Sequence, residues 1–251
     1  MGFMKTVTST AYARAGLIGN PSDGYHGKTI SVILRNFRAE ATCRESPTLK
    51  IVPRPYDGLE FNHIDDLLRN IRLHGYYGGV RLIKACIKKF HDYCRSRGID
   101  VERGNFAIEY RTDIPVRLGL AGSSAIITAA FRALMGFFEV DIPKPVLPNI
   151  ILSVETEELG INAGLQDRVI QVYEGVVFMD FNRELFEARG HGNYEAIDAD
   201  LLPPLFIAFH EDLAEGTEVG HRILADRYRM GDRQVIAAMD RMAQLAQEML
   251  K

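Results

Sequence analysis

The stretch Arg117-Leu118-Gly119-Leu120-Ala121-Gly122-Ser123-Ser124-Ala125 joins a glycine loop to an apolar run that is typical of a helix. Gly119 and Gly122 carry no Cβ, so their backbone N–H groups can approach a ligand closely. The helix that follows turns its positive end toward the same place. The hydroxyls of Ser123 and Ser124 can cap the helix, bind a phosphate oxygen or reach a metal ion. The stretch predicts an anion site, with a simple helix N-cap as the alternative.

The loop differs from two common phosphate-binding motifs. No lysine follows its glycines, as the spacing GxxxxGK[ST] would require, and the dinucleotide pattern GxGxxG is also missing. Gly27-Lys28-Thr29 is similar to the end of the first motif, but Ser22 stands where its first glycine belongs. A strand rather than a helix is predicted after it, so we discard that match.

Composition narrows the class of protein. The 251 residues are 47% hydrophobic and 25% charged, which suits a globular chain with a sizeable core in one or two domains. A formal net charge of -3 gives no reason to expect nucleic acid as a partner. Three cysteines without CxxC spacing predict neither disulfides nor a zinc site and favour the reducing cytoplasm. No apolar run reaches the length of a membrane span and no secretory signal is present, so no membrane partner is expected.

Hydrophobic periodicity predicts a mixture of strands and helices. Strands are expected over residues 6–18, 29–43, 50–53, 106–110, 176–181 and 205–209. Helices are expected over 64–97 with breaks at glycines 75, 78 and 79, and over 126–138, 150–159, 165–173, 219–228 and 234–250. The polar segment 182–199 is expected to be an irregular connection.

Three segments then follow one another in a recognisable order: residues 13–23, the glycine loop, and residues 155–167. Together they resemble the GHMP superfamily of small-molecule kinases, whose members include galactokinase, homoserine kinase and mevalonate kinase. The motif sequences are most similar to those of the glucuronokinases. They are Gly-Asn-Pro-Ser-Asp at 19–23, Gly-Ser-Ser-Ala-Ile at 122–126 and Gly-Leu-Gln-Asp-Arg at 164–168. The resemblance runs from about Tyr12 to about Asp232 and covers most of the chain.

The resemblance implies an α+β fold with two domains. The first would be similar to domain 2 of ribosomal protein S5, would occupy residues 1–202 and would bind ATP and substrate. The second, ferredoxin-like in the family, would begin after the boundary at Pro203-Pro204. The family's third glycine-rich motif is missing, and one strand and two helices are too few for the usual sheet. We therefore expect residues 203–251 to form an incomplete second domain, whose apolar C-terminal helix favours a homo-oligomer.

The resemblance also implies an activity, namely Mg-ATP-dependent phosphorylation of a sugar or sugar acid. The expected reaction converts D-glucuronate to its 1-phosphate. Two alternatives remain open. The missing third motif suggests a non-catalytic homologue that binds a nucleotide or a sugar, and the same chemistry would serve another sugar such as galactose.

Phosphoryl transfer needs a triphosphate cradle, a metal ion and charge stabilisation, and the resemblance assigns residues to each. Mg²⁺ would be held by Ser124 and Glu155, with Glu158 as a fallback ligand, and Ser123 would cap the helix or touch phosphate. A solvated helix face is the plainer interpretation of each glutamate. The ATP phosphates would be wrapped by Gly119, Leu120, Ala121, Gly122, Ser123, Ser124 and Ala125.

The catalytic pair implied by the resemblance is Asp167 and Arg14. Asp167 corresponds to the family's catalytic aspartate, which accepts the proton of the substrate hydroxyl or orients that hydroxyl. Arg14 would lie beside it and stabilise charge on the transferred phosphoryl group. Each residue also has a structural alternative. Asp167 would be a first-turn aspartate favoured by the helix dipole, and Arg14 an ordinary arginine at the edge of a strand.

For the acceptor, Asp23 stands where galactokinase-like members hold sugar hydroxyls, although an aspartate in a turn is often a local Asx motif. Tyr25 and Gly27 would shape the same pocket. The carboxylate of a uronic acid also needs a cation, ideally a bidentate arginine, for which Arg117 and Arg168 are the candidates. The sequence does not choose between these two.

Overall fold

The frame of the protein is a sheet of six strands. The computed structural model describes residues 5–53, 78–101, 104–116, 118–208 and 217–250. Among these, the path β3-β4-β2-β5-β6 forms the sheet, and β1 adds to it by pairing with β2. The strands are β1 (Thr6–Ile18), β2 (Lys28–Glu45), β3 (Lys50–Ile51), β4 (Phe106–Thr112), β5 (Val176–Asp180) and β6 (Asn193–Ile197).

The long strand β2 organises this sheet. β1 runs antiparallel to it along its length, with register shifts at Tyr12/Ala13 and Gly16/Ile18. On its other edge, β4 pairs with residues 39–45 and β5 with residues 28–32, both antiparallel. β3 is parallel to β4, and β6 is antiparallel to β5. One strand thus connects the two halves of the sheet.

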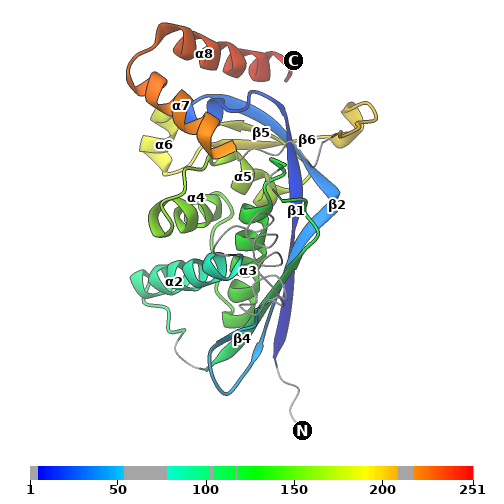
Figure 1. The fold of residues 1–251 in the computed structure, drawn as a ribbon, viewed down its shortest axis with the longest axis vertical. Helices are drawn as coiled ribbons and strands as arrows, with labels where there is room; N and C mark the ends of the chain where they lie inside the picture. Colours follow the sequence, from blue (N-terminus) through cyan, green and yellow to red (C-terminus); the bar gives the residue numbers. More distant parts are fainter. Residues whose placement is uncertain (1–4, 54–77, 102–103, 117, 209–216, 251) are drawn as a thin grey trace, which may run out of the picture.

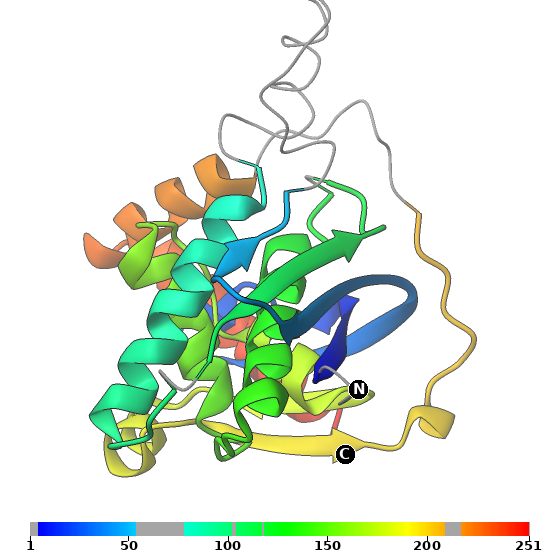
Figure 2. The same ribbon diagram turned by 90° about the horizontal axis from the view of Figure 1, so that it is seen from below.

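Helices cover one face of this sheet, as Figure 1 shows for α2, α3, α4 and α5. Seen from below in Figure 2, α2 and α3 run side by side against the strands. The helices are α2 (Val80–Ser96), α3 (Gly122–Phe138), α4 (Leu147–Ser153), α5 (Gln166–Tyr173), α6 (Arg183–Arg189), α7 (Thr217–Arg229) and α8 (Arg233–Glu248).

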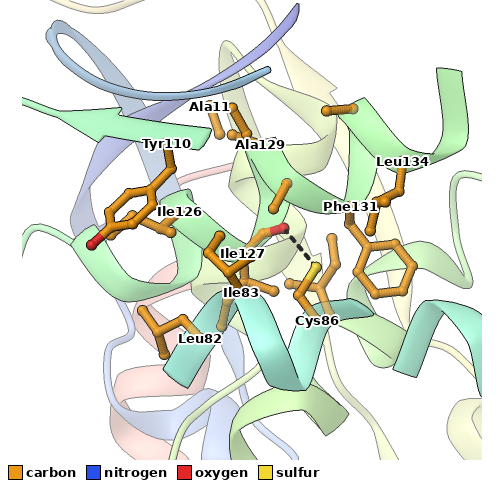
Figure 3. Close-up of a cluster of buried hydrophobic side chains, with 14 of the residues drawn as sticks. Ala11, Leu82, Ile83, Cys86, Tyr110, Ile126, Ile127, Ala129, Phe131 and Leu134 are labelled. Carbon is orange, nitrogen blue, oxygen red and sulfur yellow. Dashed lines mark hydrogen bonds between the residues drawn. The ribbon is translucent and has the colours of Figure 1, made fainter. Parts of the chain in front are cut away.

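The core is built around α3. This helix is apolar on nearly all sides, which is the pattern of a fully buried helix. Figure 3 shows Ile83 and Cys86 of α2 facing Ile127 and Phe131 of α3, and the Cys86 thiol donates a hydrogen bond to the Ile127 carbonyl at 3.8 Å. Phe131 is fully buried there. The first turn of α3, which follows the glycine loop, is therefore held in place by a packed core.

The far end of the sheet is packed on both faces. Val177 and Met179 of β5 belong to a cluster with residues of α5, while their neighbour Phe178 belongs to another cluster that Leu250 packs against. Alternation along β5 thus directs one set of side chains to α5 and the other to the C-terminal segment. In Figure 1, α8 lies across this end of the molecule.

Most expected elements are confirmed, with small shifts at their ends. Two expectations are wrong. Segment 182–199 contains α6 and β6, and the Asn182 side chain caps α6 by accepting a hydrogen bond from Glu184 N at 2.8 Å. Residues 205–208 form no strand, and Phe206 is 96% exposed. Residues 64–77, the end of the 205–209 segment and Arg117 lie outside the described residues.

The C-terminal helix also differs from expectation. Its apolar face was expected to be exposed, but Val235, Met239 and Ala246 are buried within the chain itself. Lys28 on β2 donates a hydrogen bond to Gln247 Oε1 at 2.6 Å and lies 3.0 Å from an Asp180 oxygen. The exposed apolar face that favoured a homo-oligomer is therefore largely covered.

Among the described helices, none is both long and apolar enough to cross a bilayer.

Candidate active site

Three separate parts of the chain meet at the side chain of Arg14. This residue lies on β1, and its side chain is 14% exposed. Its Nε donates a hydrogen bond to Asp167 Oδ1 at 2.7 Å, and its Nη1 donates one to the carbonyl of Gly119 at 2.9 Å. Asp167 stands in the first turn of α5. The structure thus brings together the expected catalytic pair, and Arg14 joins this pair to the glycine loop.

The glycine loop is anchored by three successive carbonyl groups. Besides the Gly119 carbonyl, the Leu120 carbonyl accepts from the Arg14 backbone N–H at 3.2 Å, and the Ala121 carbonyl accepts from Gln171 Nε2 at 2.9 Å. In a planar trans peptide the N–H points opposite to the carbonyl of the preceding residue. The N–H group that follows each of these three carbonyls in the chain therefore points away from β1 and α5.

The backbone of the loop has the shape of an anion cradle. Gly119 has φ of 70°, and a Cβ placed there would meet no other atom within 4 Å, so the space beside it is open. Ala121 also adopts the left-handed conformation, with φ of 61° and ψ of 42°. α3 then begins at Gly122. Its first N–H groups have no partner within the helix, and its dipole favours a negative charge at this end.

The two serines of the loop point in different directions. Ser123 is exposed, and its hydroxyl donates to Glu155 Oε1 at 2.8 Å. Ser124 is fully buried, and its hydroxyl donates to the Ala121 carbonyl at 3.0 Å. Successive residues of an α-helix are rotated by about 100°, so only one of the two can face Glu155. We expected Ser124 beside Glu155, and the structure places Ser123 there.

Glu155 is positioned by an irregular helical turn. The helix expected over 150–159 is α4 followed by a π-helical segment, Val154–Glu158, and such segments are frequent at functional sites. Glu155 is 2% exposed and forms an ion pair with Arg168. Glu158 lies on another face, where its carboxylate is 2.7 Å from Lys88 Nζ on α2. The structure thus brings Glu155, and not the fallback Glu158, to the loop.

Arg168 was a candidate cation for the carboxylate of a uronic acid, but its guanidinium lies inside the protein. It is 2% exposed, and its guanidinium donates to Glu155 Oε2 and to the Gly164 carbonyl, the latter at 2.7 Å. Burial lowers the pKa of this guanidinium, and the positive charge of Arg14 lowers it further. Arg168 therefore supports Glu155 from within the protein.

Asp23 interacts with α5 as well as with the backbone of its own turn at Gly24. It lies in the 3-10 segment Ser22–Tyr25, and its Oδ2 accepts from the Gln166 N–H at 3.2 Å. A Cβ at Gly164 would lie 2.2 Å from that oxygen, so this close approach requires glycine. Burial raises the pKa of Asp23 to about 6, and the negative charge of Asp167 contributes in the same direction. The two carboxylates thus lie close enough to act on each other electrostatically.

Tyr25 and Gly27 frame the same turn. A Cβ at Gly27 would approach Ser22 Oγ to 2.3 Å, so Gly27 shapes the turn that presents Asp23. The ring of Tyr25 packs on that of Tyr228 from α7, with 4.5 Å between centroids. Burial raises the pKa of Tyr25, as does the charge of Asp23, while the charge of Arg229 lowers it. α7 therefore stands beside the turn that carries Asp23.

Two functional neighbours were not identified from the sequence. Gln171 is fully buried on α5 and binds the loop, although it stands in an otherwise apolar stretch between Ile170 and Val172. A polar residue on the buried face of a helix is a usable signal for such a role. No sequence pattern indicates a role for Tyr228, because its contact with Tyr25 joins residues far apart in the sequence.

The metal-binding capacity of the site is small by itself. Among the described residues, no three His, Cys, Asp or Glu side chains gather as a metal site. One carboxylate and one hydroxyl, from Glu155 and Ser123, do meet beside the loop. Mg²⁺ is commonly held by one or two such oxygen ligands together with substrate phosphates and water. The residues present fit that mode of binding.

Comparison with known proteins identifies the family. The model of the GHMP kinases N terminal domain matches residues 81–175, which include the glycine loop, α3 and α5. The chain belongs to the GHMP kinase superfamily. It is 44% identical over 241 residues to Glucuronokinase 1 of Arabidopsis thaliana, and 44% identical over 242 residues to Probable glucuronokinase 2 of the same plant. Each match covers 95% of this chain and 66% of the relative, so the chain spans just under two thirds of their length.

Solved structures support the fold. The galactokinase of Lactococcus lactis, complexed with galactose, superposes with a TM-score of 0.65 at 17% identity. That alignment covers 91% of this chain and 58% of the galactokinase. The mixed α+β architecture is therefore that of the GHMP kinases.

The raised pKa of the half-buried Asp23 carboxyl predicts a pH-dependent stability. Its pKa of about 6 in the folded protein lies above the ordinary 3.8, so the folded state binds the extra proton between these values and stability falls as pH rises through them. Asp23→Asn keeps an acceptor for the Gln166 N–H and removes the charge. We expect it to stabilise the protein by about 1–3 kcal/mol at pH 7.5 and by progressively less toward pH 4.

Urea denaturation at several pH values measures this difference. Asp240→Asn, at an exposed position on α8, is the matched control and is expected to leave stability unchanged across the range. An Asp23→Asn protein that is less stable than the wild type at pH 7.5 would contradict the assignment.

Proposed function

We propose that this protein is a Mg-ATP-dependent kinase of a uronic acid, and that it converts D-glucuronate to its 1-phosphate. The observation that carries the proposal is the convergence of the anchored glycine loop, the Arg14–Asp167 pair and Asp23 in one site. The similarity to glucuronokinases suggests the substrate. In this proposal residues 1–202 form the domain that binds ATP and acceptor, and residues 203–251 begin a second domain.

The triphosphate would lie along the outward N–H groups of the loop Gly119 to Ala125 and at the N-terminus of α3. These dipoles are fixed before the reaction, so they cost little reorganisation when charge develops. Glu155 and a loop serine would hold Mg²⁺, which neutralises phosphate charge. The contact between Ser123 and Glu155 favours Ser123 as that serine, and Ser124 is the choice that the family resemblance suggests.

In the transfer step, the anomeric hydroxyl oxygen of the acceptor attacks the γ-phosphorus of ATP. A new P–O bond forms, the bond between the γ-phosphorus and the oxygen bridging it to the β-phosphorus breaks, and ADP leaves. Asp167 accepts the hydroxyl proton or orients the hydroxyl. Arg14, which already bonds Asp167, stabilises the charge on the transferred group.

The acceptor would bind between Asp23 and α7. Asp23 would bond sugar hydroxyls, and Tyr25 with Tyr228 would form a wall of the pocket. Because Arg168 is buried against Glu155, another cation is needed for the carboxylate of the sugar acid. Arg229 is our candidate, since it is exposed, follows Tyr228 and acts electrostatically on Tyr25. Its Nη1 pairs with Asp226 at 3.0 Å on the surface, and the substrate carboxylate would compete for this weak, solvated contact.

A coupled assay of ADP release with a panel of uronic acids and aldoses tests the reaction. We expect turnover that depends on Mg-ATP and is highest with D-glucuronate. Asp167→Asn is expected to lower kcat at least 100-fold, because the acceptor hydroxyl loses its general base. Turnover with galactose alone would change the substrate, and ATP binding without turnover on any sugar would identify a non-catalytic homologue.

The choice between the two serines can be tested directly. Ser123→Ala is expected to raise the Mg²⁺ concentration for half-maximal activity about tenfold, because Glu155 loses its neighbouring oxygen ligand. Ser124→Ala removes a buried hydrogen bond to the loop and is expected to lower thermal stability with a smaller effect on the Mg²⁺ requirement. The reverse ranking in a Mg²⁺ titration would assign the metal to Ser124.

The carboxylate contact is tested by substrate comparison. Arg229→Met is expected to raise KM for D-glucuronate about tenfold and to leave KM for an uncharged aldose unchanged, because only the acid loses an ion pair. Arg227→Met, on the same helix, provides the matched control, since Arg227 is also an exposed arginine with an ion-pair partner, Asp232 at 2.7 Å, but only Arg229 acts electrostatically on Tyr25. Equal effects of Arg229→Met on acid and aldose would exclude Arg229 as the carboxylate ligand.

A further inference from the structure

We propose that Gln171 is a positioning residue that fixes the phosphate loop relative to the catalytic aspartate. The proposal rests on the proposed function in that it takes the loop to be the nucleotide site. Gln171 touches neither substrate nor metal in this assignment. Its effect would be transmitted through the backbone of the loop.

The amide of Gln171 has a partner for each of its polar atoms. The side chain is fully buried, and its Nε2 donates to the carbonyl of Tyr12 at 3.1 Å and to that of Ala121 at 2.9 Å. Its Oε1 accepts from the Thr128 hydroxyl at 3.4 Å. Two donors and one acceptor at this position are what a glutamine offers, whereas a glutamate would place an oxygen against two carbonyl groups.

The bond to Ala121 acts on the most constrained residue of the loop. An alanine in the left-handed conformation is disfavoured by contact between its Cβ and the backbone. Its carbonyl accepts hydrogen bonds from Gln171, from the Ser124 hydroxyl and from the Ala125 N–H. Together these bonds fix the plane of the following peptide, so the N–H of Gly122 points to the open side where the phosphates would lie.

Gln171 also sets the distance between the two halves of the site. It stands four residues after Asp167 on α5, so both side chains lie on the same side of that helix. From there it holds the loop through Ala121 and holds β1 through Tyr12, two residues before Arg14. One buried amide therefore connects the phosphate cradle, the strand of the arginine and the helix of the aspartate.

Arg132 provides a matched control. It lies further along α3, where its Nη1 donates to the Thr10 carbonyl on β1 at 3.1 Å. Its Nη2 donates to the carbonyls of Gln171 and Val172 on α5, both at 3.0 Å. Arg132 thus connects α3 with β1 and α5, as Gln171 does through its bonds to Thr128 and Tyr12, but has no described hydrogen bond to the loop.

The test compares Gln171→Met with Arg132→Met, measuring thermal denaturation and the Kd for Mg-ATP by calorimetry in the absence of sugar. Both variants are expected to lower Tm. Gln171→Met is expected to weaken ATP binding about tenfold or more, since the carbonyls of Tyr12 and Ala121 each lose a donor and the loop loses its anchor to α5. Arg132→Met is expected to keep the Kd for ATP within about twofold of the wild type.

Unchanged ATP affinity in Gln171→Met, or equal weakening in the two variants, would overturn the proposal. Should Gln171→Met not fold, Gln171→Asn keeps the amide but withdraws it by one methylene, and the same loss of affinity is expected. ATP binding is measured without an acceptor. A chain that binds ATP but phosphorylates no uronic acid therefore refutes the proposed substrate and leaves the role of Gln171 intact.

Discussion

The contact on which the candidate site depends is the pairing of Arg14 with Asp167. Arg14 also binds the carbonyl of Gly119, so one guanidinium joins a strand, a loop and a helix that are distant in the sequence. The side chains of Arg14 and Asp167 are 14% and 19% exposed, so each would be left partly desolvated without the other. Removing one member of such a pair is costly, because the remaining charge has no partner. The pair therefore fixes the geometry of the site as well as supplying its charges.

Two further buried groups extend this arrangement. Gln171 anchors the carbonyl of Ala121, so the N–H groups of the loop are directed outward before any ligand arrives. Arg168, buried beneath the site, holds Glu155 beside Ser123. The reactive side of the site is thus formed by groups whose orientation is set by bonds on their other side. Such preorganisation is the main contribution that a protein makes to phosphoryl transfer.

Much of the fold could be predicted from the sequence, because apolar periodicity reports which face of a helix or strand is buried. The glycine loop, Glu155 and Asp167 could be located by their motifs. The orientations of Ser123 and Ser124 could not, because they depend on where α3 begins and on the π-helical turn that carries Glu155. Arg168 was misjudged for a related reason. A charged residue looks exposed in a sequence until its buried partner is known.

The proposed reaction is the transfer of the γ-phosphoryl group of ATP to the anomeric hydroxyl of a uronic acid. Phosphorus NMR of the protein incubated with Mg-ATP and D-glucuronate tests it most directly. We expect a new phosphate ester signal split by the anomeric proton, together with an equal amount of ADP. Formation of ADP and inorganic phosphate without an ester signal, or an unchanged ATP spectrum, would contradict it.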